Sequence, residues 1–141
     1  MLALQDVFDM RDDNIFKAAS GLAGGIGRMH DACGALLGAS MFLGLKHGRG
    51  REEIDNREKL TNSYLPVGKL YKWFEKEFGS ATCLEVCTRF GGGVFYDTQI
   101  PWQAELAKEV GLTKKCAELA AKTAARTAEM LWDAIEAEKK K

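Results

Sequence analysis

The sequence predicts an all-α fold, a single-domain bundle of about five helices around an apolar central helix at about 31–47. Apolar residues recur at steps of three and four through most of the chain, which is the period of an amphipathic helix. The stretch 32–45 is apolar on every side, contains three glycines and is shorter than the ~18 residues of a membrane span. With 46% apolar and 28% charged residues, the 141-residue chain has the composition of one globular domain, which we place at 1–141.

The first two predicted helices differ in how they begin. Residues 2–8 have helical spacing but no capping residue before them, so we expect this helix to begin upstream of Met1. Asp12 or Asp13 can cap the second helix, which runs into a glycine-rich turn at 21–27.

The central helix and the amphipathic helix after it carry terminal signals. Asp31 stands where an N-cap is expected for the central helix, and Gly48 follows its last turn. The next strong pattern runs from 60 to 78, where Pro66 either kinks the helix or marks its start. Gly79 ends it.

Three segments complete the chain. A short helix capped by Ser80 or Thr82 carries Cys83 and Cys87, which are four residues apart and therefore lie on one face. The stretch 94–102 has strand-like composition, reads equally as an extended loop, and is closed by Pro101. An alanine-rich last helix spans about 113–138.

The charge balance and the apolar pattern of the sequence indicate which partners and which cellular compartment to expect. Lys plus Arg equals Asp plus Glu at 20 each, so the chain has no net field to attract nucleic acid, and we expect no nucleic-acid partner. We expect no membrane insertion, because no apolar stretch reaches the ~18 residues of a membrane span. We expect a cytoplasmic location, because the start lacks the positive segment and cleavage site of a signal peptide. The apolar central helix and small-residue faces favour a homodimer.

The four cysteines are the unusual feature. Cys33, Cys83 and Cys116 fall near the starts of three predicted helices, where free amide groups and the helix dipole stabilise a thiolate. A shared redox or metal site is one interpretation. The other is that these cysteines simply pack in the core, because cysteine is among the most buried residue types.

The spacing of cysteines and glycines argues against several known kinds of cofactor site. The chain has only a C-x3-C pair, at Cys83 and Cys87, and not the C-x2-C pairs of zinc ribbons and ferredoxins. No C-x-x-C-H motif is present, so no covalent haem is expected. Gly25 and Gly27 form half of a dinucleotide fingerprint, but His30 occupies the third glycine position and no strand precedes it.

Several blocks together resemble the C-GCAxxG-C-C family of redox-active proteins, which is similar to part of the split-Soret cytochromes. The most specific block is the CGALLG sequence that begins at Cys33, preceded by the GGIG turn. The blocks that carry the resemblance are 24–28, 33–39, 43–48, 74–83 and 115–119. They cover most of the chain.

The resemblance assigns three of the four family cysteines to Cys33, Cys83 and Cys116. The first family cysteine has no counterpart here, which agrees with an N-terminal helix that begins upstream of Met1. Cys87 is an additional cysteine.

We therefore expect a thiol-based redox or electron-transfer accessory protein that acts with a redox partner protein. Cys33, Cys83 and Cys116 would be the redox thiols, and with Cys87 they could instead hold an iron–sulfur cluster or another thiophilic metal. Gly25, Gly27 and Gly34 would border the cofactor. The alternative is a non-catalytic helical dimerisation module with structural cysteines.

Overall fold

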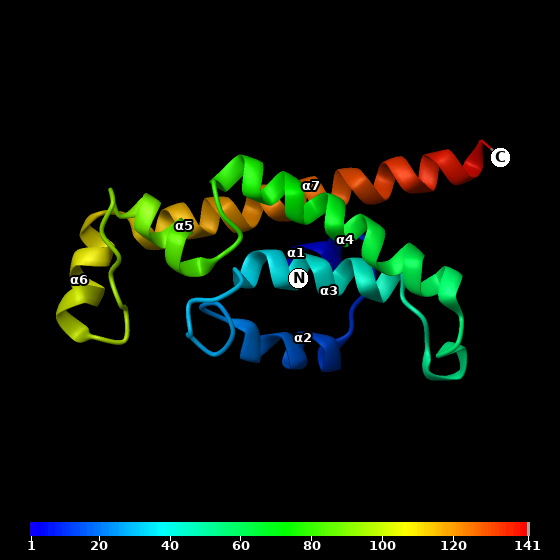
Figure 1. Cartoon of the computed structure of the whole chain (residues 1–141), viewed down its shortest axis with the longest axis horizontal. Coiled ribbons are helices and arrows are strands. Elements are labelled where there is room, and N and C mark those ends of the chain that lie inside the picture. The colour runs from blue at the N-terminus through cyan, green and yellow to red at the C-terminus, as the bar shows by residue number, and fades with distance from the viewer. Residues whose placement is uncertain (141) are drawn as a thin grey trace.

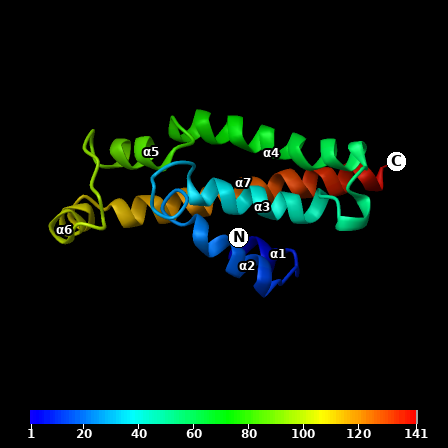
Figure 2. The same ribbon diagram turned by 60° about the horizontal axis from the view of Figure 1, so that its bottom comes forward.

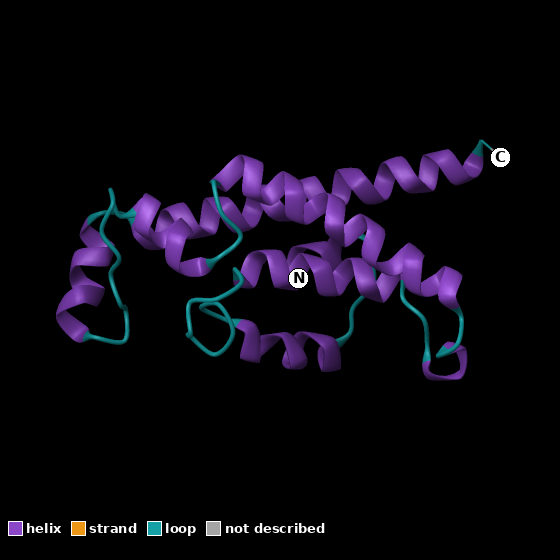
Figure 3. Cartoon of the chain, viewed as in Figure 1, coloured by secondary structure: helices purple, strands orange, loops and turns teal. Residues whose placement is uncertain are grey.

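The computed structural model describes residues 1–140, and Lys141, the last residue of the predicted domain, lies outside the described residues. Within the described chain there are seven α-helices, two short 3-10 helices and no strand (Figure 3). The predicted all-α fold is confirmed, whereas the predicted number of five helices is too small. Among the described residues no helix combines the length and hydropathy needed to cross a membrane.

Three helices form the body of the molecule: α3 (Gly34–His47), α4 (Arg57–Phe78) and α7 (Leu112–Lys139). Helix α3 packs against both of the others, and α4 also contacts α7 (Figure 1). Two short helices, α1 (Leu2–Val7) and α2 (Asp13–Ala19), lie on the side of α3 that faces away from α4 (Figure 2). The predicted central helix is thus confirmed, although it begins at Gly34 rather than at about residue 31.

The core lies along α3. Phe42 and Leu43 of α3 and Leu70 and Phe74 of α4 are fully buried. Helix α7 adds Leu119, Thr123, Thr127 and Leu131, all at most 3% exposed. The two buried threonines satisfy their hydroxyls by donating to backbone carbonyls one turn earlier in α7. Burial of this continuous apolar face holds the long helices together.

Local capping chemistry sets several helix ends as predicted. Asp12 caps α2, because its carboxylate accepts from the backbone amides of Asn14 and Ile15 at 2.9 and 3.1 Å. Gly79 ends α4 in the left-handed conformation at φ +81°. Pro66 lies inside α4 and does not mark its start.

Two expectations about loops are wrong. Asp31 does not cap α3, because Cys33 occupies the N-cap position and Asp31 lies in the loop before it. Pro101 does not close an extended segment but begins α6 (Pro101–Glu109), since proline at the first helical position loses no hydrogen bond. The segment between α5 (Cys83–Phe90) and α6 is a loop and not a strand.

Candidate functional site

The loops that precede α3 and α5 are tied together by backbone hydrogen bonds. The Cys33 amide donates to the Ala81 carbonyl at 2.8 Å, and the Cys83 amide donates to the Asp31 carbonyl at 2.6 Å. The two bonds surround an isolated antiparallel bridge. They place two cysteines that are far apart in the sequence at the starts of two neighbouring helices.

The start of α5 is fixed by hydroxyl groups. The Thr82 hydroxyl accepts from the Glu85 amide at 3.3 Å, which confirms the predicted N-cap. The Thr82 amide donates to the Ser80 hydroxyl at 3.0 Å. Cys83 is thereby held at the first helical position, with Cys87 one turn later. Their sulfur atoms are 3.8 Å apart, so the two thiols lie on one face of α5 as predicted.

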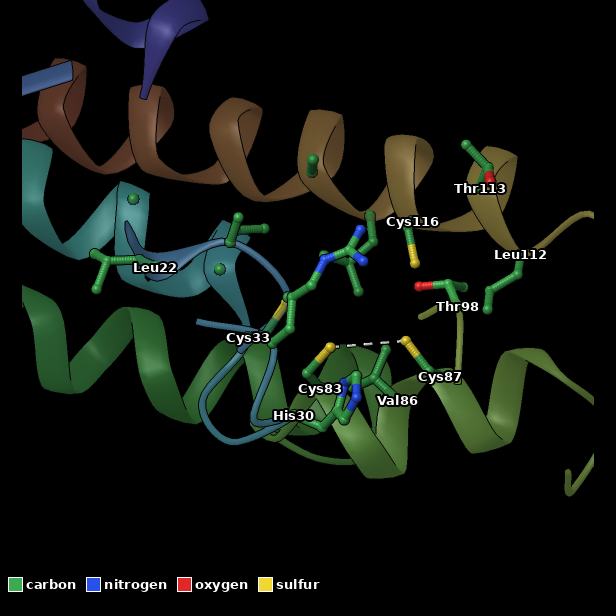
Figure 4. A pocket seen from close by; sticks show the side chains of 18 of the residues that line it. Leu22, His30, Cys33, Cys83, Val86, Cys87, Thr98, Leu112, Thr113 and Cys116 are labelled. Atoms are coloured by element: carbon green, nitrogen blue, oxygen red, sulfur yellow. Dashed lines mark hydrogen bonds between the residues drawn. The ribbon is translucent and has the colours of Figure 1, made fainter. Parts of the chain in front are cut away.

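All four cysteines line one cavity of about 610 Å³. Cys83 and Cys87 enter it from α5, Cys116 from α7 and Cys33 from the start of α3 (Figure 4). All four are free thiols; Cys87 is buried, and the other three are partly exposed. The rest of the wall is largely apolar and includes Leu22, Val86, Phe95, Leu112 and Leu119. The structure therefore brings together every cysteine that the sequence analysis singled out.

The thiols along α5 and α7 differ in acidity because of how they hydrogen-bond. The Cys87 thiol and, to a smaller extent, His30 lower the pKa of Cys83 to about 6, although burial opposes this. Cys87 also lowers the pKa of Cys116. The pKa of Cys87 itself is raised, first by Cys116 and then by Cys83, because interaction with these two neighbouring sulfur atoms holds the proton on Cys87. Cys83 is therefore the thiolate of the cluster at neutral pH.

Cys33 differs from this group. Burial raises the pKa of its thiol, although the amides of Ala35 and Leu36 at the start of α3 act in the opposite direction. The predicted stabilisation by a helix N-terminus is present but is smaller than the effect of burial. Cys33 therefore lines the cavity as a protonated thiol at neutral pH.

His30 stands beside the thiols. Its ring packs edge-on against Phe95 with centroids 4.8 Å apart, and its Nε2 lies 4.0 Å from a carboxylate oxygen of Asp97. That nitrogen is buried and makes no hydrogen bond to the described residues.

His30 comes from a turn with an unusual backbone. Five consecutive residues, 24–28, have φ between +59° and +76°, and His30 follows at +62°. This left-handed conformation costs a non-glycine residue about 1–2 kcal/mol, and β-branched Ile26 is one of those that adopt it. Backbone hydrogen bonds support the turn, among them His30 to Gly24 at 3.1 Å. The turn brings Arg28 and His30 to the cavity wall, and the sequence analysis did not identify Arg28.

The three glycines expected at a cofactor lie in different surroundings. Gly34 lines the cavity. Gly25 is buried directly behind Cys83, since a Cβ atom there would lie 2.8 Å from the Cβ of Cys83. Gly27 is exposed, is not part of the lining and would have nothing within 4 Å of a Cβ atom. Close approach of the turn to α5 is thus the role that the structure gives to Gly25.

The thiols do not form a preassembled metal cage. Within residues 1–140, no group of three or more His, Cys, Asp or Glu side chains is arranged to hold a metal ion.

Four free thiols that line one cavity are the groups that a cysteine-based redox or metal site would use. The profile of the family described as "Putative redox-active protein (C_GCAxxG_C_C)" matches residues 1–130. The chain belongs to this family. A search of curated proteins and of solved structures finds no match.

Proposed function

We propose that the chain is a thiol-based redox protein in which Cys83 and Cys87 cycle between dithiol and disulfide. The observation that carries the proposal is the 3.8 Å separation of their sulfur atoms on the wall of a cavity that a substrate can enter. Residues one helical turn apart have Cα atoms about 6 Å apart, which lies within the range that disulfides span. A small rotation of both side chains can therefore close the bond.

The reaction follows from the acidities of the thiols. The Cys83 thiolate attacks one sulfur of a substrate disulfide, which forms a mixed disulfide and releases the other half as a thiolate. Cys87 then loses its proton and attacks the Cys83 sulfur, which forms the Cys83–Cys87 disulfide and releases the second half. Two electrons pass from the protein to the substrate. The first half leaves as a thiolate, and the one thiol proton, that of Cys87, passes to a departing product thiolate.

An anaerobic redox titration with a dithiothreitol couple tests this function. We expect a two-electron transition that is lost in Cys83→Ser and in Cys87→Ser. Cys33→Ser is the matched control, because it removes a thiol of the same cavity that lies outside the pair, and it should keep the transition. Loss of folding stability in all three variants without any two-electron transition in the wild type would support the helical dimerisation module instead.

A soft metal bound by the same thiols is the second candidate. Two thiolates on one tetrahedral metal with bonds of about 2.3 Å lie about 3.8 Å apart, and Cys83 and Cys87 have this separation. Cys116 and Cys33 would be the further ligands, and an iron–sulfur cluster there would supply one-electron transfer. Elemental mass spectrometry of anaerobically purified protein tests it: stoichiometric iron or zinc that is lost in Cys83→Ser supports this candidate, and metal-free protein opposes it.

A further inference from the structure

Among the described residues, the lining of the thiol cavity contains basic side chains and no carboxylate side chain. Arg28 and His30 are the basic side chains of its lining, and no Asp or Glu of the described chain belongs to that lining. The carboxylate oxygen of Asp97 lies 4.0 Å from Nε2 of His30, but Asp97 is not part of the lining. A ligand that enters the cavity therefore meets apolar walls, thiols and basic groups.

Arg28 has no partner of its own. Its guanidinium forms no hydrogen bond or ion pair with the residues that the structure describes. Its backbone is nevertheless held at φ +65°, a conformation that is unfavourable for arginine. An arginine whose planar guanidinium is unpaired can bind a carboxylate through two parallel hydrogen bonds.

The dimensions of the cavity fit a small molecule. Its volume of about 610 Å³ lies within the range of pockets that enclose small ligands. Cys87 is only 9% exposed, so the resolving thiol is reached through the cavity and not from an open surface. Because Cys83, the attacking thiol, lines the same cavity, a substrate places its reactive sulfur at the cavity wall.

We propose that the substrate is a small organic disulfide with an apolar body and an anionic group, which Arg28 binds while Cys83 attacks the disulfide. The inference rests on the proposed dithiol function and adds the class of substrate. The substrate disulfide is reduced to two thiols as the Cys83–Cys87 pair is oxidised, so the electron balance is that of the proposed reaction.

Two coloured aromatic disulfides provide the test. Dithiobis-nitrobenzoate carries two carboxylates, whereas dithiodipyridine is neutral near pH 7, and both release an absorbing thiol on reaction. Stopped-flow rates with anaerobic, fully reduced protein are measured for the phase that disappears in Cys83→Ser. The variants are Arg28→Gln and Arg28→Lys, with Arg89→Gln as the control. Arg89 lies on α5 two residues from Cys87, is exposed and is not part of the lining, so its loss changes the net charge equally.

We expect Arg28→Gln to slow the dianionic probe about tenfold, the effect of one lost charge-assisted hydrogen-bonding contact, and the neutral probe less than about twofold. Arg28→Lys should recover part of the loss, and Arg89→Gln should affect both probes alike. An equal effect of Arg28→Gln and Arg89→Gln on the dianionic probe would overturn the inference while leaving the dithiol function in place. A neutral probe that reacts equally fast with Cys83→Ser would overturn the dithiol function itself. Unchanged reaction with the neutral probe also shows that Arg28→Gln is folded.

Discussion

The left-handed turn contacts Cys83 at Gly25, and replacement of Gly25 by alanine tests that contact. A Cβ atom at Gly25 would lie 2.7 and 2.8 Å from the backbone nitrogen and oxygen of Asp31 and 2.8 Å from the Cβ of Cys83. These neighbours cannot yield independently, because the Asp31 carbonyl accepts the Cys83 amide. Gly27 is a matched control, since it has a positive φ of +59° but nothing within 4 Å of a Cβ atom.

Gly25→Ala and Gly27→Ala share one destabilising effect, and Gly25→Ala has a second one. Alanine in the left-handed conformation costs each about 1 kcal/mol of folding free energy. Gly25→Ala adds the overpacking of a tight contact, about 1–3 kcal/mol. At roughly 4 °C per kcal/mol for a domain of this size, Gly25→Ala should melt about 4–12 °C below Gly27→Ala.

Thermal and urea unfolding of the reduced proteins, followed by circular dichroism, measures the difference. Alkylation of Cys83 by iodoacetamide gives a second readout, which should change in Gly25→Ala and stay at the wild-type rate in Gly27→Ala. Equal melting temperatures for the two variants would refute the close approach of the turn to Cys83.

Three further results follow from the site. Alkylation of Cys83 should rise with pH through a midpoint near 6, because only the thiolate reacts. At about pH 5.5 it should exceed that of a free cysteine of pKa about 8.5 roughly 20-fold, after allowance for the weaker nucleophilicity of an acidic thiolate; a midpoint near 8.5 would contradict the assignment. Cys87→Ala removes the thiol that hydrogen-bonds to Cys83, so the same pH profile should shift upward, and an unchanged midpoint would count against that bond. Thr82→Ala should lower the unfolding free energy in urea by about 1 kcal/mol through loss of the α5 cap, and no loss would show that this cap is dispensable.

Local chemistry made much of the fold predictable. Gly79 is predicted as a helix end, and Asp12 and Thr82 are each one of two predicted caps, because capping depends on residues within one turn. Pro101 was misjudged because proline fits both the end of an extended segment and the first position of a helix. Asp31 was misjudged because a tertiary contact decides its role, as its carbonyl accepts the Cys83 amide in the bridge between two loops.

The sequence predicted the thiols of the candidate site but not its basic residue Arg28. Cysteines at three predicted helix starts made a shared site one of two interpretations, and the structure brings these cysteines to one cavity. Arg28 was missed because its place depends on a run of positive φ angles, and Ile26 within that run gives the opposite signal. The glycines at 24, 25 and 27 were the one sign of an unusual turn.

Peptide mapping of the oxidised protein tests the central claim most directly. Cys83 and Cys87 lie on one tryptic peptide, 77–89, because no Lys or Arg separates them. After oxidation with dithiodipyridine and alkylation of the remaining thiols, the account predicts that this peptide lacks two hydrogens and both alkyl groups, while Cys33 and Cys116 are alkylated and dithiothreitol reverses the change. Alkylation of both Cys83 and Cys87 after oxidation, or a disulfide that joins other cysteines, would contradict it.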